Sequence, residues 1–459
     1  MIVPAPDPAF QMVPARHQFS SVQILLMVGW VLNGLSLRGS CGVLGWMQEM
    51  PVNWGFDFPV PHFTTVRFWL LRLGYYKLHR PKENASDWVW IIDHSNQIGQ
   101  EKCFVILGVR LCHLPPPGPE FPLSLPQMEP IELEPVTTSD KQVVYRQLQD
   151  NVSKTGVPRA IISDHGSDLA GGIELFRQAH PETVDVYDLS HKAACLLKAR
   201  LEHDEQWKAF AAKAGQTKCG IQQTEWAFLN PPSQRVKARY MNLGPLIAWG
   251  VSTLALLDNP GPEVLKHGTK ERLEEKLGWL REFREELRGW SELQQTIDVA
   301  LEFGRTQGLY RGAAWELRKQ LRKLPLGKTA ARLRDDLIKF VAQQARRLKP
   351  GERIPFTSEV IESTFGKYKL VEGEQSRGGF TSLLLALAAC VAERTQEVVH
   401  EALEKTKTVD VIAWIKTRLG QTVGSKRRIA YQAAKASLPS PNNPERATKP
   451  EGTQMSPAP

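Results

Sequence analysis

From residue 88 to residue 190 the sequence changes repeatedly between short β-rich apolar runs and helical spacing, and this alternation restricts the possible folds more than any other feature. The runs at 88–93 and 102–111 are separated by a polar turn, which predicts a hairpin. A third strand is expected at 131–136, and two further strands, the first ending at Asp164, alternate with helices. This order predicts an α/β fold with a mixed sheet covered by helices, in which three antiparallel strands are followed by parallel crossovers.

Helical spacing dominates the second half of the chain. In residues 216–350 apolar side chains recur at helical intervals between charged ones, so we expect an all-helical insertion there. Helical spacing continues in 351–425, which we expect to complete the domain begun by residues 86–215. The tail at 426–459 is basic and then rich in Pro, Ser and Asn, a composition that predicts disorder from Ser437 onward.

A helical segment at 18–80 precedes the sheet, and residues 1–17 are expected to be disordered. Its third helix, at 62–74, combines an apolar stripe with Thr and Arg side chains that can face outward, as in the recognition helix of a helix-turn-helix domain. We therefore predict a helix-turn-helix-like DNA-binding domain. A small helical cap with a solvated basic face is the alternative, because the connection at 50–61 is long for such a turn. The predicted DNA-facing residues are Thr64, Thr65, Arg67 and Arg72.

The composition favours a polyanionic partner. The 459 residues carry a formal net charge of +9 that is spread along the chain, which suits nucleic acid, although ordinary basic enzymes are similar. Six cysteines lie far apart without a Cys-x-x-Cys pair, so we expect reduced thiols and no zinc site. The apolar stretch at 22–35 is shorter than the roughly 20 residues that span a bilayer, and no secretory signal precedes it. We expect a cytoplasmic protein without a membrane segment.

Three acidic residues occupy positions that suit a metal site. Asp93 and Asp164 each follow a buried apolar run, and Glu362 lies in a helical segment that begins near Ser358. Carboxylate oxygens are ligands that Mg²⁺ prefers, and two ions about 3.5 to 4 Å apart can act on the attacking and leaving oxygens of a phosphodiester. Asp93 would bridge both ions, Asp164 would hold one and Glu362 the other.

Each acid has a structural alternative. An Asp at a strand end is often only a turn or capping residue. Asp168 competes with Asp164, but it lies at an apparent helix start, where an acid needs no role beyond stabilising the helix dipole. Glu359 lies in the first turn of its helix in the same way, whereas Glu362 shares a helix face with Lys369.

With Asp93, Asp164, Glu362 and Lys369 in this order, the chain resembles bacterial insertion-sequence transposases of the DDE superfamily. In that family one acid ends the first strand, another ends the fourth, and a helical Glu is followed two turns later by a Lys. The family's catalytic domain is RNase H-like, and a helical insertion after the fifth strand explains a long gap before the third acid. The resemblance covers roughly residues 20–425.

This resemblance implies a DNA transposase that hydrolyses a strand at the element end and joins the freed 3′-hydroxyl to target DNA. It implies two Mg²⁺ ions, for which Mn²⁺ would substitute, and a homodimer or larger assembly on double-stranded DNA carrying terminal inverted repeats. The location implied is bacterial and nucleoid-associated. Lys369 would contact a phosphate near the transposon end, as would Lys367 and Arg377. The family's Tyr and Arg upstream of the Glu are replaced by Pro355 and Ser358, which leaves the subfamily open.

Further side chains remain open to more than one interpretation. His191 follows the fifth predicted strand and could either approach the scissile phosphate or satisfy a helix cap. Trp279 and Trp315 lie on basic helices, and by resemblance an insertion aromatic can stack on a flipped base, which is worth roughly 1 to 3 kcal/mol. Trp290 shares the apolar stripe and is expected in the core. Two alternative functions are an RNase H-like DNA nuclease and a domesticated, non-catalytic DNA-binding protein.

Overall fold

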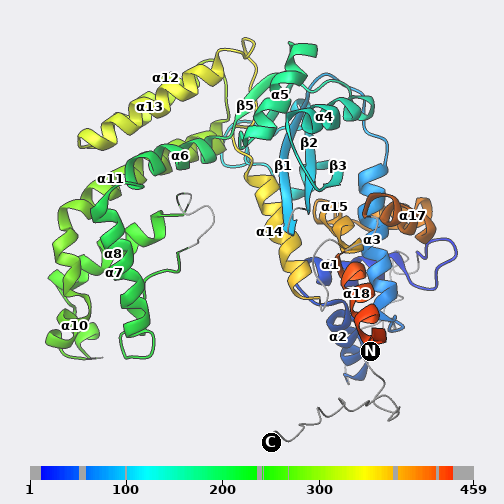
Figure 1. Ribbon diagram of the computed structural model, residues 1–459, viewed down its shortest axis with the longest axis horizontal. Helices are drawn as coiled ribbons and strands as arrows, with labels where there is room; N and C mark the ends of the chain where they lie inside the picture. The colour runs from blue at the N-terminus through cyan, green and yellow to red at the C-terminus, as the bar shows by residue number, and fades with distance from the viewer. Residues whose placement is uncertain are drawn as a thin grey trace, which may run out of the picture.

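The computed structural model describes residues 12–50, 58–98, 101–234, 240, 242–266, 268–375, 381–419 and 423–437. In Figure 1 the sheet lies where groups of helices meet, with α4 (Lys141–Thr155) and α5 (Ser167–Ala179) beside it. The N- and C-terminal helices lie below the sheet in this view, and a long helical arm extends to the left. No helix among the described residues has both the length and the apolar character to cross a membrane.

Among the described residues, five strands form one mixed sheet in the order β3-β2-β1-β4-β5. β1 pairs antiparallel with β2, and β2 pairs antiparallel with β3. On its other side β1 pairs parallel with β4, which pairs parallel with β5. The predicted mixed α/β sheet is therefore confirmed. The strands are β1 (Trp88–Ile98), β2 (Glu101–Arg110), β3 (Glu129–Val136), β4 (Ala160–Ser163) and β5 (Val184–Tyr187).

Both faces of the sheet are buried, which explains why β1 begins as a continuous apolar run. Trp90 and Ile92 pack against the side covered by α4 and α5, whereas Val89 and Ile91 belong to the core on the opposite side. Side chains alternate along a strand, so Asp93 shares the face of Val89 and Ile91. We expected β1 to end at Asp93, but the strand continues to Ile98. The parallel pairing with β4 is recorded only up to Ile91, so Asp93 lies just beyond it.

The N-terminal helices share a core with helices from the end of the chain. α3 packs against α15 and α16 as well as against α1 and α2. The approach is so close that a Cβ added at Gly74 of α3 would overlap the carbonyl oxygen of Leu385. The helices concerned are α1 (Ser21–Leu32), α2 (Leu37–Glu49), α3 (Phe63–His79), α15 (Ala386–Cys390) and α16 (Gln396–Lys405).

Two basic side chains of α3 are buried in this shared core. Arg72 is only 9% exposed, and its guanidinium donates to the carbonyl oxygens of Leu403 and Thr406. The expected outward orientation of Arg72 is therefore wrong, because these distant carbonyls take up its donors. Lys77 is fully buried, and its ammonium lies 3.0 Å from Glu129 and 2.8 Å from Glu393.

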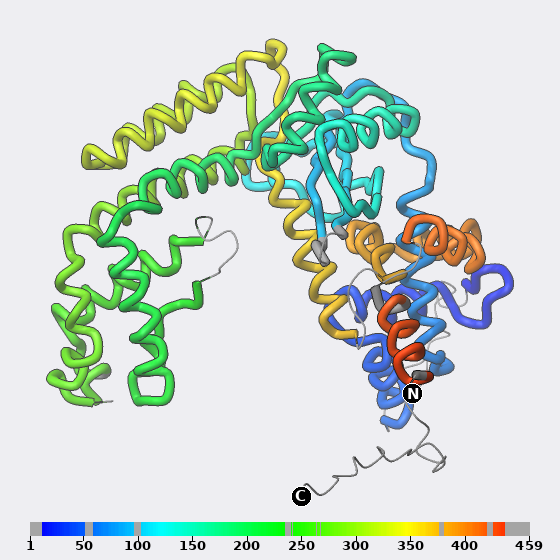
Figure 2. The backbone as a smooth tube through the Cα atoms, viewed as in Figure 1, coloured from blue at the N-terminus to red at the C-terminus, as the bar shows by residue number. Residues whose placement is uncertain are grey.

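Helices fill most of the described chain between β5 and Glu359. The tube in Figure 2 shows this part leaving the sheet, forming the arm and returning beside it. Trp290 is buried edge-to-face against Trp207, so its expected place in the core is confirmed. The helices are α6 (Leu189–Leu201), α7 (Glu205–Ile221), α8 (Gly244–Asp258), α9 (Pro262–Leu265), α10 (Lys270–Leu277), α11 (Arg284–Gln307), α12 (Ala313–Leu321) and α13 (Lys328–Ala345).

Three further helices complete the described chain. Glu362 lies in the first of them, and the last contains the start of the predicted basic tail. Residues 1–11 and 438–459, which hold most of the predicted disordered termini, lie outside the described residues. The helices are α14 (Glu359–Gly373), α17 (Thr408–Leu419) and α18 (Val423–Ser437).

Candidate metal centre

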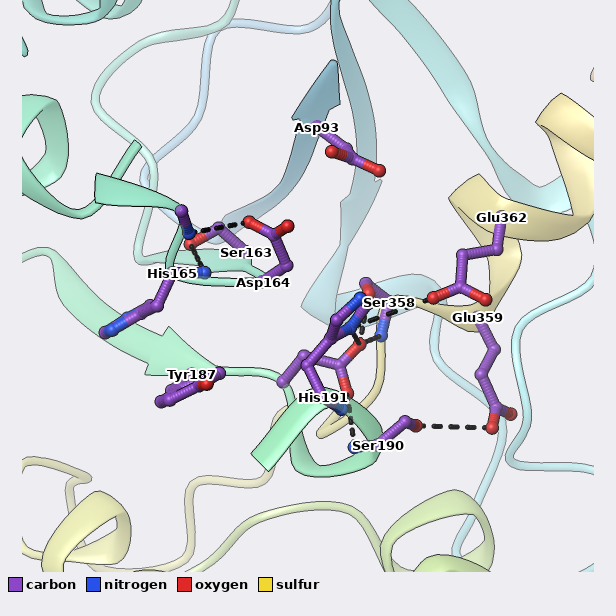
Figure 3. A network of polar contacts seen from close by, with 12 residues as sticks. Asp93, Ser163, Asp164, His165, Tyr187, Ser190, His191, Ser358, Glu359 and Glu362 are labelled. Carbon is purple, nitrogen blue, oxygen red and sulfur yellow. Dashed lines mark hydrogen bonds and ion pairs between the residues drawn. The ribbon is translucent and has the colours of Figure 1, made fainter. Parts of the chain in front are cut away.

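The three predicted acids come from three different elements that meet at one end of the central strands. Asp93 lies within β1, Asp164 directly follows β4, and Glu362 lies on α14, which packs against β1. Figure 3 shows their carboxylates on different sides of one space. The structure thus brings together the residues that are far apart in the sequence.

Asp93 has the most perturbed carboxyl group of the three. Burial raises its pKa, the neighbouring charge of Asp164 adds to this effect, and the resulting pKa is about 7. A hydrogen bond from the backbone N–H of His94, at 2.6 Å, and the charge of His191 oppose the shift only in part. A nearby cation would restore the charged form of Asp93, because it favours a carboxylate over a carboxylic acid.

Asp164 and its competitor Asp168 have different partners. Asp164 accepts a hydrogen bond from the backbone N–H of Gly166 at 2.8 Å, and its other oxygen points away from that turn (Figure 3). Asp168 lies 2.9 Å from the ammonium of Lys102. Burial alone would raise the pKa of Asp168, but its hydrogen bonds and neighbouring positive charges lower it to about 2. Asp168 is therefore held in an ion pair, which favours Asp164 as the ligand.

Glu359 and Glu362 also have different partners. Glu359 forms a forked pair with Arg305 of α11, with nitrogen–oxygen distances of 2.6 to 3.0 Å. Glu362 faces the site instead, and its Oε1 lies 3.7 Å from Nδ1 of His191. Burial raises the pKa of Glu362, and the carboxylates of Asp188 and Asp164 act in the same direction.

Asp188 links two elements of the site, and it was not among the predicted site residues. It is fully buried and caps α6 by accepting the backbone N–H groups of Ser190 and His191. Its other oxygen accepts the backbone N–H of Ser358 at 2.8 Å and also the Ser358 hydroxyl. One carboxylate thus joins the start of α6 to the start of α14. The signal in the sequence was an Asp placed directly before a helix, which is a usual capping position.

His191 lies between two carboxylates. Its Nδ1 is 3.5 Å from Asp188 and 3.7 Å from Glu362. Burial alone would lower the pKa of His191, but the interaction with Asp188, supported by the charges of Glu362 and Asp164, raises it to about 9. The imidazolium therefore offsets part of the negative charge that these acids bring together.

The donor set suits a hard divalent cation. The ligand atoms of Asp188, His191 and Glu362 all lie within 4.8 Å of one another, so this group could hold a metal ion once the His191 imidazolium had lost a proton. Asp93, Asp164 and Glu362 do not form a group of that closeness in the part of the chain that the structure describes. The charges of Asp164 and Glu362 nevertheless raise the pKa of Asp93, and the charge of Asp164 raises that of Glu362. Oxygen donors are those that Mg²⁺ selects.

The predicted DNA-contacting residues have diverse surroundings. Lys369 is exposed on α14, whereas Lys367 is half-buried and burial lowers its pKa. Arg377 lies outside the described residues. On α3 the guanidinium of Arg67 donates to the Ser382 hydroxyl. Thr64 and Thr65 are half-buried near the start of that helix.

Of the two tryptophans considered for base stacking, only one is exposed. Trp279 is half-buried, and its indole N–H donates to the Thr217 hydroxyl at 2.9 Å. Trp315 of α12 is 59% exposed, with the ammonium of Lys319 over its ring. Trp315 therefore remains available to a ligand in this structure.

Comparisons with known proteins add one distant likeness. The chain is similar to a solved structure described as the Drosophila P element transposase strand transfer complex, with 11% sequence identity and a TM-score of 0.37. The match covers 86% of this chain and 94% of that one. No protein-family model matches the chain, and no curated protein matches it.

Proposed function

We propose that the protein is a DNA transposase of the DDE type, with Asp93, Asp164 and Glu362 as its metal-binding acids. The observation that carries this proposal is the convergence of the three carboxylates beside the end of β4, where burial, together with the charges of Asp164 and Glu362, raises the pKa of Asp93 to about 7. Carboxylates that disfavour one another's charge in this way form a site to which a divalent cation adds stability.

The proposal assigns the sheet to the RNase H-like class. The antiparallel β1, β2 and β3, followed by the parallel β4 and β5, have the element order that led us to expect this class. In such a sheet the first strand and the end of the fourth lie side by side. Val89 of β1 and Ala160 of β4 are paired here, so Asp164, which directly follows β4, comes next to the strand that contains Asp93.

Some residues of the site would bind metal ions, and others would position the metal-binding residues. Asp93 and Asp164 would hold metal from the sheet, and Glu362 would complete the set from α14. Bound Mg²⁺ ions would supply the Lewis-acid stabilisation of the attacking and leaving oxygens of a phosphodiester. Asp188 positions Glu362 because it binds the backbone at Ser358, one turn before it. Glu359, held by Arg305, stays outside the donor set.

The substrate that we propose is double-stranded DNA carrying the terminal inverted repeats of an element, with target DNA as the second substrate. Lys369 would contact a phosphate near the element end, with Lys367 and Arg377 as further contacts. Thr64, Thr65 and Arg67 remain proposed DNA contacts of α3. Two element ends must be held together for paired reactions, so we propose that a homodimer or larger assembly forms on DNA.

The direct test is a strand-cleavage and strand-transfer assay with purified full-length protein. The labelled duplexes carry the DNA that flanks the reading frame in its genome, and supercoiled plasmid serves as target. We expect Mg²⁺-dependent nicking and joined products, lost with EDTA and with Asp93→Asn, and restored in part by Mn²⁺. Cleavage without joining would instead support a nuclease, and DNA binding without cleavage would support a non-catalytic protein.

A matched control separates metal binding from structural damage. Asp164→Asn removes a carboxylate just before α5, and Asp168→Asn removes one from the first turn of that helix. We expect Asp164→Asn to abolish cleavage at an unchanged melting temperature, whereas Asp168→Asn should leave most of the activity. Equal activity in both variants would contradict the assignment of Asp164.

A further inference from the structure

The last described helix, α18, presents a face of positive charge around an aromatic ring. Tyr431 follows Arg427 by four residues and Arg428 by three, and Lys435 follows Tyr431 by four, so these residues share one side of the helix. Tyr431 is 70% exposed, and every side chain from 426 to 436 is exposed. The helix contains no Asp or Glu, so no acid within it neutralises this face. α18 is the red helix in Figure 1.

The opposite side of α18 carries Lys426 among small or apolar residues. Ile429, Ala433 and Ala436 share it, and of these three only Ile429 has a long side chain. A helix that binds in a membrane interface needs a broad apolar face, commonly with Trp, Phe or Leu. α18 lacks such a face, so its chemistry favours a polyanion that is bound through charge and an exposed ring. Nucleic acid is a polyanion of this kind.

We propose that the Arg427, Arg428, Tyr431 and Lys435 face of α18 is a second DNA-binding surface, independent of base sequence. The two guanidiniums and the ammonium bind backbone phosphates of a duplex, and the Tyr431 ring packs against the sugar-phosphate backbone between them. The surface is distinct from the acids of the metal centre. The proposal rests on the proposed function for the choice of DNA as partner, but it needs no catalysis.

The test measures binding of the full-length protein to a fluorescent duplex of arbitrary sequence, by anisotropy in EDTA over a range of salt concentrations. Arg427→Ala/Arg428→Ala is compared with Ala433→Glu/Ala436→Glu, which lowers the net charge equally but on the opposite face. For two lost phosphate contacts we expect the slope of log affinity against log salt to become shallower by about 1.8, with about tenfold weaker binding at 0.1 M salt. The control should change affinity about twofold or less.

Several results would overturn this assignment. Equal weakening by both double variants would mean that only net charge matters, and an unchanged slope in Arg427→Ala/Arg428→Ala would mean that these residues do not touch phosphate. Loss of binding to phosphatidylserine vesicles in that variant, with an unchanged duplex slope, would show a membrane partner. Lys435→Ala provides an independent check, with an expected slope change of about 0.9. Circular dichroism should show the same melting temperature for all variants.

The two proposals fail in different ways. Asp93→Asn should abolish cleavage while leaving the salt slope unchanged. If the unmodified protein cleaves nothing with Mg²⁺ but Arg427→Ala/Arg428→Ala still changes the slope, the catalytic proposal fails and the α18 surface stands. If cleavage is Mg²⁺-dependent but the slopes are identical, only the α18 surface fails.

Discussion

Glu359 and Glu362 lie one turn apart on α14, yet their surroundings give them opposite roles. Glu359 is bound by Arg305, whereas Glu362 faces the other carboxylates and His191. The sequence favoured Glu362 because this residue shares a helix face with Lys369. No sequence pattern indicated that Arg305, which lies on α11, pairs with Glu359. Single carboxylates at strand ends could thus be found by pattern. Their partners could not, because those partners come from distant elements.

We predict that Glu362→Gln abolishes Mg²⁺-dependent cleavage at an unchanged melting temperature. Glu359→Gln should retain cleavage and lose stability, by about 1 kcal/mol, because the ion pair with Arg305 is partly exposed to solvent. Cleavage assays and urea unfolding distinguish the two. Loss of cleavage in Glu359→Gln with full activity in Glu362→Gln would reverse the assignment.

A second residue-scale prediction concerns stability in acid. Burial alone would raise the pKa of Glu129, but the hydrogen bond from Arg80 and the charges of Lys77 and Lys82 lower it to about 2. A depressed carboxyl pKa stabilises the fold above the ordinary pKa, and this contribution is lost as the pH falls toward 2. Glu129→Gln should therefore reduce stability by about 3 kcal/mol at pH 7 and remove that part of the acid sensitivity.

Chemical unfolding at a series of pH values checks this prediction. Glu83→Gln is the matched control, because Glu83 is 67% exposed and its loss should cost less than about 0.5 kcal/mol. If Glu129→Gln lost stability between pH 4.5 and 2 as steeply as the unmodified protein, the ion cluster would not be the source of the acid sensitivity.

At the scale of elements, α3 shows where sequence patterns stop being informative. Its apolar stripe was visible, and Val66, Trp69 and Leu70 are indeed buried. The burial of Arg72 was not predictable, because the carbonyls that receive its donors belong to residues more than three hundred positions away. A sequence pattern predicts that a polar side chain is exposed to solvent unless its hydrogen-bond partners are known. The face of α3 that looked like a DNA-reading surface is partly a packing surface.

The packing of α3 on α15 can be tested at a single glycine. Gly74→Ala should destabilise the protein by about 2 to 3 kcal/mol, because the new Cβ would overlap the Leu385 carbonyl oxygen. Gly29→Ala in α1 is the matched control, since a Cβ there meets nothing within 4 Å. Ala favours a helix more than Gly does, so the control should be neutral or stabilising by up to about 1 kcal/mol. Equal melting temperatures for both variants would contradict this close packing.

At the scale of the whole molecule, helices near both ends of the described chain share one core. α3 lies against α15 and α16, so the N-terminal helices are covered by segments that follow the sheet and the inserted helices. A local sequence pattern shows how a segment folds, but not which remote segment completes its core. The strand order from 88 to 190 was therefore predictable, because its elements are neighbours in sequence. The meeting of the two chain ends was not.

We predict that residues 12–80 and 81–437 do not fold when expressed separately. Without α3, the fully buried side chains of Leu385, Leu387 and Val391 would lose part of their cover and promote aggregation. Coexpression of the two fragments should restore a soluble complex of one copy of each, measured by size-exclusion chromatography. Two fragments that are each soluble and cooperatively folded would show instead that residues 12–80 form an autonomous domain.

Asp188 and Ser358 mark the two points at which the chain leaves the sheet for the helical arm and returns beside it. The backbone N–H of Leu189 also donates a hydrogen bond to the carbonyl oxygen of Phe356 at 3.1 Å. Hydrogen bonds therefore connect these two points directly. Closing a longer excursion between fixed ends costs little, about 0.6 kcal/mol for each doubling of length. The length of the arm therefore has little effect on the cost of bringing its two ends together, and Glu362 keeps its position as long as these hydrogen bonds remain.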